Sequence, residues 1–77
     1  MSQDFTGGRR KLITYLYEAS ATVFYVGKAP PGSATSSAVW QISRYTDDGA
    51  GELSEAMAGG DDNFDNIWDN VESLSYL

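Results

Sequence analysis

Turn-forming residues divide this 77-residue chain into short segments, and this division constrains the fold more than any other feature. Pro31 with Gly32, the tract 47–51, and Gly59 with Gly60 each predict a turn, because proline presets φ and glycine accepts a positive φ. The segments between these turns are rich in β-branched and aromatic residues, which favour strands. The sequence therefore predicts a mainly β protein, a small antiparallel sheet or sandwich of about five strands with one short C-terminal helical turn.

The expected strands follow from the alternation of side chains along each segment. They span residues 11–18, 22–28, 38–46, 52–58 and 73–77. In the first of them, one face carries Leu12, Thr14 and Leu16, and the other carries Ile13, Tyr15 and Tyr17. Trp40 and Ile42 share a face of the third segment and are expected in the core. An open sheet leaves strand edges unpaired, and an assembly protein can satisfy such an edge against its neighbour.

One apolar stripe predicts the helical turn near the C-terminus. Positions i, i+3, i+4 and i+7 are occupied by Phe64, Ile67, Trp68 and Val71. Asp61, Asp62 or Asn63 is the expected N-cap of this helix. Acidic and amide side chains compete for backbone hydrogen bonds, so only a short helix is expected. The core is then expected to pack through Trp40, Ile42, Phe64 and Trp68.

Charge is separated along the chain. Residues 1–44 carry five basic and two acidic side chains, for a net charge of +3, whereas residues 45–77 carry nine acidic and no basic ones, for a net charge of −9. This separation favours head-to-tail contact between identical or related subunits. The alternative is that the acids only keep a small domain soluble. The overall charge of −6 disfavours nucleic acid as a partner.

Two residue types are missing, namely histidine and cysteine. The chain therefore lacks the usual proton shuttle at neutral pH, a thiolate nucleophile and every soft metal ligand. We expect a protein that is not an enzyme and has no cofactor. No apolar run approaches the roughly 20 residues of a membrane helix, and the start of the chain has no signal peptide. We expect no membrane partner and synthesis in a cytoplasm.

The acidic tract offers calcium candidates. Positions 1, 3, 5, 9 and 12 of an EF-hand-type loop would be Asp61, Asn63, Asp65, Asp69 and Glu72, with the Ile67 carbonyl at position 7. Position 6 is Asn66 where the pattern needs glycine, and the Gly-rich segment before the tract cannot be an entering helix. An acidic capped turn is the alternative, and we expect no metal.

The first ten residues predict a flexible arm ahead of a single β domain that spans residues 11–77. The arm is polar, contains Gly7 and Gly8, and ends in basic residues. The predicted partner-binding residues are Phe5, Arg9, Arg10 and Lys11, which combine an apolar anchor with positive charge. They would dock on an acidic groove of another subunit. The alternative is a frayed terminus without a role.

Two separated segments resemble a family of small virion proteins of tailed bacteriophages. They are YVGKAPPGSATSSAVWQI at 25–42 and FDNIWDNVESLSYL at 64–77. The family pattern is Y-x-G-x-A-x-P-G-x-A-T-S followed by W-Q-I, an acidic or Gly-rich turn, a strand, and F-D-N-x-W-D-N-R-x-S-L-x-Y. The matching positions are Tyr25, Gly27, Ala29, Pro31, Gly32, Ala34, Thr35, Ser36, Trp40, Gln41, Ile42, Phe64, Asp65, Asn66, Trp68, Asp69, Asn70, Ser73, Leu74 and Tyr76. Val71 stands where the pattern usually has arginine, so a contact made by that arginine is in doubt here.

The resemblance implies a capsid cement or decoration protein that binds the major capsid protein or sister subunits, in a homo-oligomer or other symmetric assembly. It also implies a location in the virion after synthesis in the host bacterial cytoplasm. One alternative is a tail, neck or fibre-attachment protein of low copy number. Others are a small surface module that binds glycan or calcium, and an early regulatory protein that binds a host factor through its acidic half.

Overall fold

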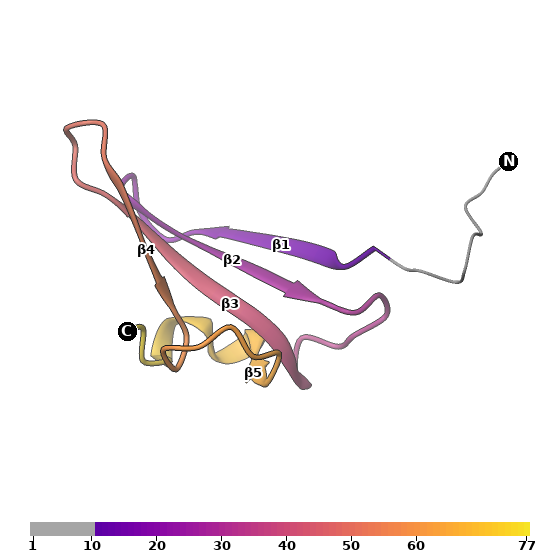
Figure 1. The fold of residues 1–77 in the computed structure, drawn as a ribbon. Coiled ribbons are helices and arrows are strands. Elements are labelled where there is room, and N and C mark those ends of the chain that lie inside the picture. Colours follow the sequence, from indigo (N-terminus) through magenta and orange to yellow (C-terminus); the bar gives the residue numbers. More distant parts are fainter. Residues whose placement is uncertain (1–10) are drawn as a thin grey trace, which may run out of the picture.

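The computed structural model describes residues 11–77 as an antiparallel sheet with one short helix (Figure 1). The elements in chain order are β1 (Ile13–Glu18), β2 (Val23–Ala29), β3 (Ala38–Asp47), β4 (Leu53–Met57), β5 (Asn66–Ile67) and the 3₁₀ helix η2 (Trp68–Ser73). Strands β1 to β4 are paired in chain order, and β5 pairs with β3. The predicted fold class, mainly β with about five strands and a short C-terminal helical turn, is confirmed.

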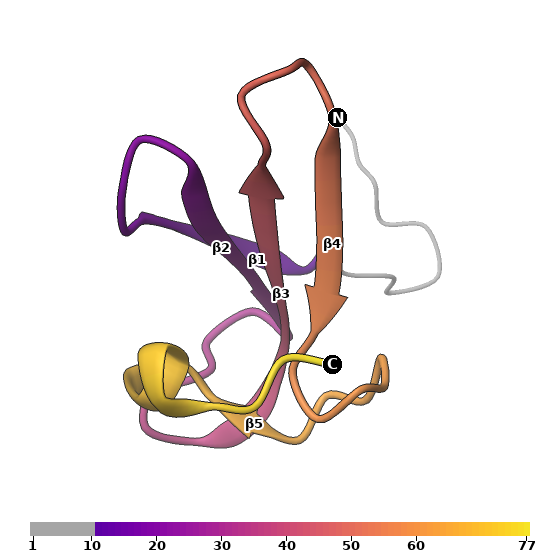
Figure 2. The same ribbon diagram turned by 90° about the vertical axis from the view of Figure 1, so that its left-hand side faces the viewer.

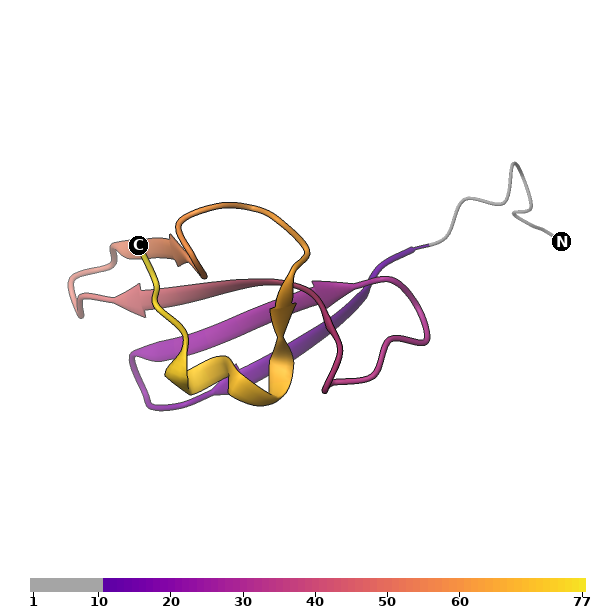
Figure 3. The ribbon, with the colours of Figure 1, turned by 90° about the horizontal axis from the view of Figure 1, so that it is seen from below.

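The pairing register assigns each side chain to one of two faces. Tyr15 lies opposite Gly27, and Gly27 lies opposite Ile42, so these three residues share a face. We call this side the packed face, because β5, η2 and the C-terminal residues lie against it (Figures 1 and 3). The apolar and aromatic residues of the other side, the outer face, are Leu16, Phe24, Val26, Tyr45, Leu53 and Met57. Its polar and charged residues are Thr14, Glu18, Lys28, Gln41, Ser43, Asp47 and Glu55. Leu12, one residue before β1, belongs to the outer face by the same alternation. The segment between β4 and β5 contacts one end of the outer face, where the side-chain amide of Gln41 donates a hydrogen bond to the carbonyl of Asp62 at 2.9 Å. Elsewhere on this face Leu16 and Leu53 remain exposed.

The core lies on the packed face and is built around the two largest fully buried side chains of the described residues, Trp40 and Ile42. Both were predicted to face the core, and this prediction is confirmed. The other buried apolar residues are Tyr25, Ala29, Ala58 and Val71. Trp68 packs against this cluster and covers Gly27. A Cβ atom on Gly27 would lie 2.5 Å from Cε3 and Cζ3 of Trp68, so the position admits only glycine without a shift of the indole.

The loop between β2 and β3 forms the predicted proline-glycine turn. Gly32 has a φ of 83°, and the amide of Ser33 donates a hydrogen bond to the carbonyl of Pro30 at 3.2 Å. The indole Nε1 of Trp40 donates to the carbonyl of Ala34 at 3.0 Å. The loop is thereby attached to the buried end of the core, because a buried indole N–H needs an acceptor.

The prediction that the C-terminal helix starts at an N-cap within residues 61–63 is wrong, because the helix begins later in the chain. Phe64 lies outside any helix and is 41% exposed, so it does not belong to the core. Ile67 is in β5, and the helix begins only at Trp68. The reason is a pair of contacts with β3. Ile67 pairs with Ala38, and the side-chain amide of Asn66 donates to the carbonyl of Trp40 at 3.0 Å, which keeps the backbone extended up to Trp68.

The predicted last strand, residues 73–77, forms only in part. Ser73 belongs to η2, and the one pairing of this segment is the bridge between Ala58 and Tyr76. Leu77 and Met57 exchange backbone hydrogen bonds of 3.1 and 3.4 Å, so the C-terminus lies beside the end of β4 (Figure 2). The tail thus continues the sheet past β4 by a short extended stretch.

Tyr76 anchors the tail to the packed face. Its hydroxyl donates to the carbonyl of Val71 at 2.6 Å, and the guanidinium carbon of Arg44 lies 5.2 Å from the centre of its ring. Burial of the phenol, with a smaller effect from Tyr25, raises the pKa of Tyr76 to about 12, although Arg44 acts in the opposite direction. The folded protein therefore favours the neutral phenol.

Replacing Gly27 with alanine is expected to lower the free energy of unfolding by about 1–3 kcal/mol, because the new methyl group displaces the indole of Trp68. Urea denaturation measures the loss, and near-ultraviolet circular dichroism reports the indole environment. The control is Gly32→Ala, which costs about 1 kcal/mol through its positive φ but has nothing within 4 Å to displace. An unchanged near-ultraviolet spectrum in Gly27→Ala would contradict the packing described here.

The raised pKa of Tyr76 predicts a loss of stability at alkaline pH. The unfolded phenol releases its proton near its ordinary value of 10.0, whereas the folded one holds it to about 12. Stability is therefore fully present below pH 10 and falls as the pH rises through this window. Tyr76→Phe is expected to cost about 1 kcal/mol at pH 8 by removing the hydrogen bond. The same variant should lose less stability than the natural protein between pH 8 and pH 11, measured by urea denaturation.

Candidate functional site

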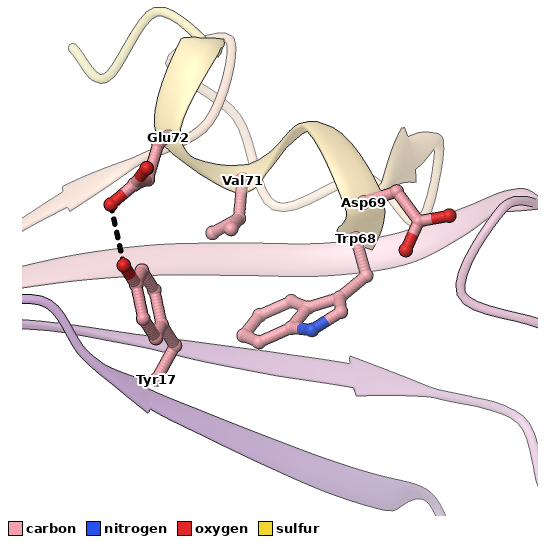
Figure 4. Close-up of a pocket in the computed structure, with 5 residues that line it drawn as sticks. All are labelled: Tyr17, Trp68, Asp69, Val71 and Glu72. Carbon is pink, nitrogen blue, oxygen red and sulfur yellow. Dashed lines mark hydrogen bonds between the residues drawn. The ribbon is translucent and has the colours of Figure 1, made fainter.

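A shallow cavity of about 270 Å³ lies between β1 and η2 (Figure 4). It is lined by Tyr17, Trp68, Asp69, Val71 and Glu72. Figure 4 shows the phenol of Tyr17 and the carboxylate of Glu72 pointing toward one another, with the indole of Trp68 on the same side of the helix. The Tyr17 hydroxyl donates to Oε2 of Glu72 at 2.6 Å. This contact joins the edge strand of the sheet to the C-terminal helix.

Aromatic packing and one backbone hydrogen bond hold the cavity in place. The ring of Tyr15 lies 4.9 Å from Trp40 and 5.9 Å from Trp68, measured between centroids. Tyr17 stacks on Tyr25 at 5.9 Å. The amide of Asp69 donates to the carbonyl of Thr35 at 3.0 Å, which fixes the start of the helix on the β2–β3 loop.

The cavity combines an aromatic floor with an acidic rim. Asp69 and Glu72 are exposed, and none of the five lining residues is basic. The hydrogen bond to the Glu72 carboxylate, followed by the charge of that carboxylate, raises the pKa of Tyr17. The phenol is thus held neutral, the opposite of an activated nucleophile. An aromatic surface beside carboxylates suits the binding of a cationic side chain such as arginine or lysine.

The outer face carries a second hollow, of about 220 Å³. Its lining residues are Val26, Lys28, Gln41, Ser43, Tyr45, Glu55 and Met57. Tyr45 stacks on Phe24 at 5.0 Å and donates to Oε2 of Glu55 at 2.9 Å. That hydrogen bond is the main cause of a raised pKa at Tyr45.

Around this hollow, the outer face exposes leucine side chains. Leu12, Leu16 and Leu53 are 46%, 60% and 55% exposed. Isolated exposed leucines are common, but here they lie on the same side of one sheet as Phe24 and Tyr45. Exposed apolar side chains among polar ones on one sheet face suit a surface that binds another protein.

The calcium candidates are not brought together. Within residues 11–77, no group of three or more acidic side chains is placed to hold a metal ion. Asp61 accepts a hydrogen bond from the amide of Asn63 at 3.0 Å, and Glu72 is engaged by Tyr17. The remaining candidates, Asp65 and Asp69, are exposed on either side of β5.

Three of the predicted partner-binding residues, Phe5, Arg9 and Arg10, lie outside the described residues, as does the predicted arm. The fourth, Lys11, is exposed and lies two residues before β1. Sequence reasoning missed the cavity beside Glu72. Tyr17 and Glu72 are 55 positions apart in the chain, so no local pattern connects them. The one signal in the sequence was that both faces of β1 carry large side chains.

In comparisons with known proteins, no family model, no curated protein and no solved structure matches this chain. Within the described part of the chain, no helix is both long and apolar enough to cross a bilayer.

Each tyrosine–carboxylate pair predicts a specific change in titration. In Glu72→Gln the pKa of Tyr17 should fall toward its ordinary value of 10.0, because the carboxylate that stabilises the neutral phenol is gone. The pKa of Tyr45 should not change. Glu55→Gln should do the reverse and lower only the pKa of Tyr45. Nuclear magnetic resonance of labelled tyrosine rings measures both values, and each variant is the control for the other.

Proposed function

We propose that this protein is a non-enzymatic structural component of a tailed-phage virion, a cement or decoration subunit of the capsid. Its partners would be the major capsid protein or sister subunits. The observation that carries this proposal is a sheet that is packed on one face and leaves Leu12, Leu16 and Leu53 exposed on the other, among polar and charged side chains. Exposed apolar side chains on one face suit a protein that completes its packing in an assembly. The phage setting rests on the sequence resemblance.

The two segments that resemble the phage family contact one another in the folded chain. Residues 25–42 and 64–77 pack on one another, with Trp40 and Trp68 5.7 Å apart. Asn66 binds the carbonyl of Trp40, and Gly27 makes room for Trp68. The shared residues thus build one folding unit, so a protein with both segments is expected to share this fold.

The separated charges of this protein support a role in adhesion to another protein subunit. The predicted arm carries Arg9 and Arg10, and Lys11 follows it, so this end of the chain is positively charged. The cavity beside Asp69 and Glu72 carries negative charge. Opposite charges on separate parts of a subunit steer association and fix its orientation more than they add affinity. The arm would bind an acidic groove of the capsid protein or of a sister subunit.

Quantitative mass spectrometry of purified particles tests the proposal. A copy number comparable to that of the major capsid protein is the expected result for a cement or decoration protein. A few copies per particle would instead place the protein in the tail, neck or fibre attachment. Absence from the particle would overturn the structural role and favour the regulatory alternative.

The arm is tested by replacing Arg9 and Arg10 together with alanine. The doubly substituted protein is expected to occupy assembled shells at a clearly reduced level, because the charge that steers docking is lost. Lys28→Ala is the charge control, since Lys28 is a described basic residue on the sheet and away from the arm. Full occupancy by a protein without residues 1–10 would show that the arm has no role in binding.

A further inference from the structure

The edge of β1 that faces away from β2 has no partner within the described residues. The amide of Ala19 donates to the carbonyl of Val23 at 3.0 Å, just beyond the pair formed by Glu18 and Phe24. In an antiparallel ladder, this bond directs the backbone groups of Tyr17, and of every second residue before it, toward β2. The backbone groups of Thr14 and Leu16 therefore point outward from the sheet.

This edge carries little of what usually protects an edge strand, since its one charged residue, Glu18, is the last residue of β1. Proteins block such edges with proline, a bulge or a charged residue within the strand. From Ile13 to Tyr17, β1 has no proline, glycine or charged residue, and its register with β2 runs without a shift. Lys11, two residues before β1, and Glu18, the last residue of β1, carry opposite charges.

We propose that β1 pairs with the β1 of a second copy, antiparallel and about a twofold axis at Thr14, to form one continuous sheet. Thr14 would lie opposite its own copy, and Leu12 would lie opposite Leu16. On the packed face, Ile13 would lie opposite Tyr15, and Lys11 opposite Tyr17. The outward backbone groups of Thr14 and Leu16 fall on hydrogen-bonded pairs in this register.

Charge complementarity favours the antiparallel direction. Antiparallel pairing brings Lys11 of each copy beside Tyr17 of the other copy. It does so on the face where the Tyr17 hydroxyl donates to Glu72 at 2.6 Å. The cation thus meets the acidic rim of the cavity. A parallel pairing would place Lys11 beside Lys11 and Glu18 beside Glu18, and like charges on adjacent strands are destabilising.

The exposed leucines favour a twofold axis at Thr14 over one at Tyr15. Leu12 and Leu16 lie on the outer face and are 46% and 60% exposed. With the axis at Thr14, the two leucines of each copy meet those of the other and form one cluster across the interface. With the axis at Tyr15, Leu12 would lie opposite the charged Glu18, which leaves the apolar side chain without an apolar partner. The dimer needs no other protein, so it does not depend on the proposed place in a virion.

Sedimentation equilibrium tests the dimer with the full-length protein. Leu16→Lys places positive charge in the centre of the proposed interface and is expected to weaken dimerisation by about tenfold or more. Leu53→Lys is the matched control, because Leu53 is 55% exposed on the same face but lies on β4 at the far side of the sheet. The control is expected to dimerise as the natural protein does. Circular dichroism checks that both variants are folded.

Disulfide trapping tests the register, because the natural chain has no cysteine. In Thr14→Cys the two new thiols would lie on Cα atoms about 5.5 Å apart, within the range that a disulfide spans. Mild oxidation should therefore convert this variant to a covalent dimer far faster than Ser54→Cys, an exposed position on β4.

Three results would overturn the proposal. One is a monomer at every concentration, which would leave the edge to a different protein or to the chain's own N-terminal residues. Another is equal loss of association in Leu16→Lys and Leu53→Lys, which would indicate contact between β1 and β4 of successive copies. The third is equal trapping at positions 14 and 54. None of them bears on presence in the particle, so this proposal and the virion role fail separately.

Discussion

The contact of Trp68 with Gly27 is the constraint on which the rest of the structure depends. A glycine in the middle of β2 leaves a gap in the packed face, and the indole fills it beside the buried Trp40. This contact fixes the start of η2, which in turn places Val71 in the core and Glu72 over Tyr17. In a chain of this size the core is small, so one large aromatic side chain carries much of the packing.

The same contact explains why one face of the sheet remains open. After β4, the helix η2 lies against the packed face (Figure 1), and only the segment around Asp62 contacts the outer face, at Gln41. The described chain has no segment left to cover Leu16 and Leu53 on the outer face. A subunit that pairs with an open strand edge and binds only the folded state stabilises that state, and this is the arrangement proposed above. The packing that forms the fold therefore also leaves open the face and the edge that the proposed assembly would use.

Local patterns predicted the strands well and the C-terminal segment poorly. Alternation along the chain located the first four strands to within one or two residues and assigned Trp40 and Ile42 to the core. The spacing of Phe64, Ile67 and Trp68 suggested a helical stripe, but the hydrogen bond from Asn66 to Trp40 holds that segment extended. A contact between positions 26 residues apart leaves no local pattern, so sequence reasoning could not find it. The cavity beside Glu72 was missed for the same reason.

The sequence by itself determined the turns, the strand segments, the separation of charge and the absence of histidine and cysteine. These properties depend on single residues and their near neighbours, which act through backbone preference and composition. Both faces of β1 carry large side chains, so the sequence left open which face is covered. The tertiary structure decided this, because Trp68 on Gly27 and Val71 in the core both pack on the same face. It also left the edge of β1 unpaired within residues 11–77, since strand order is set by contacts between distant segments.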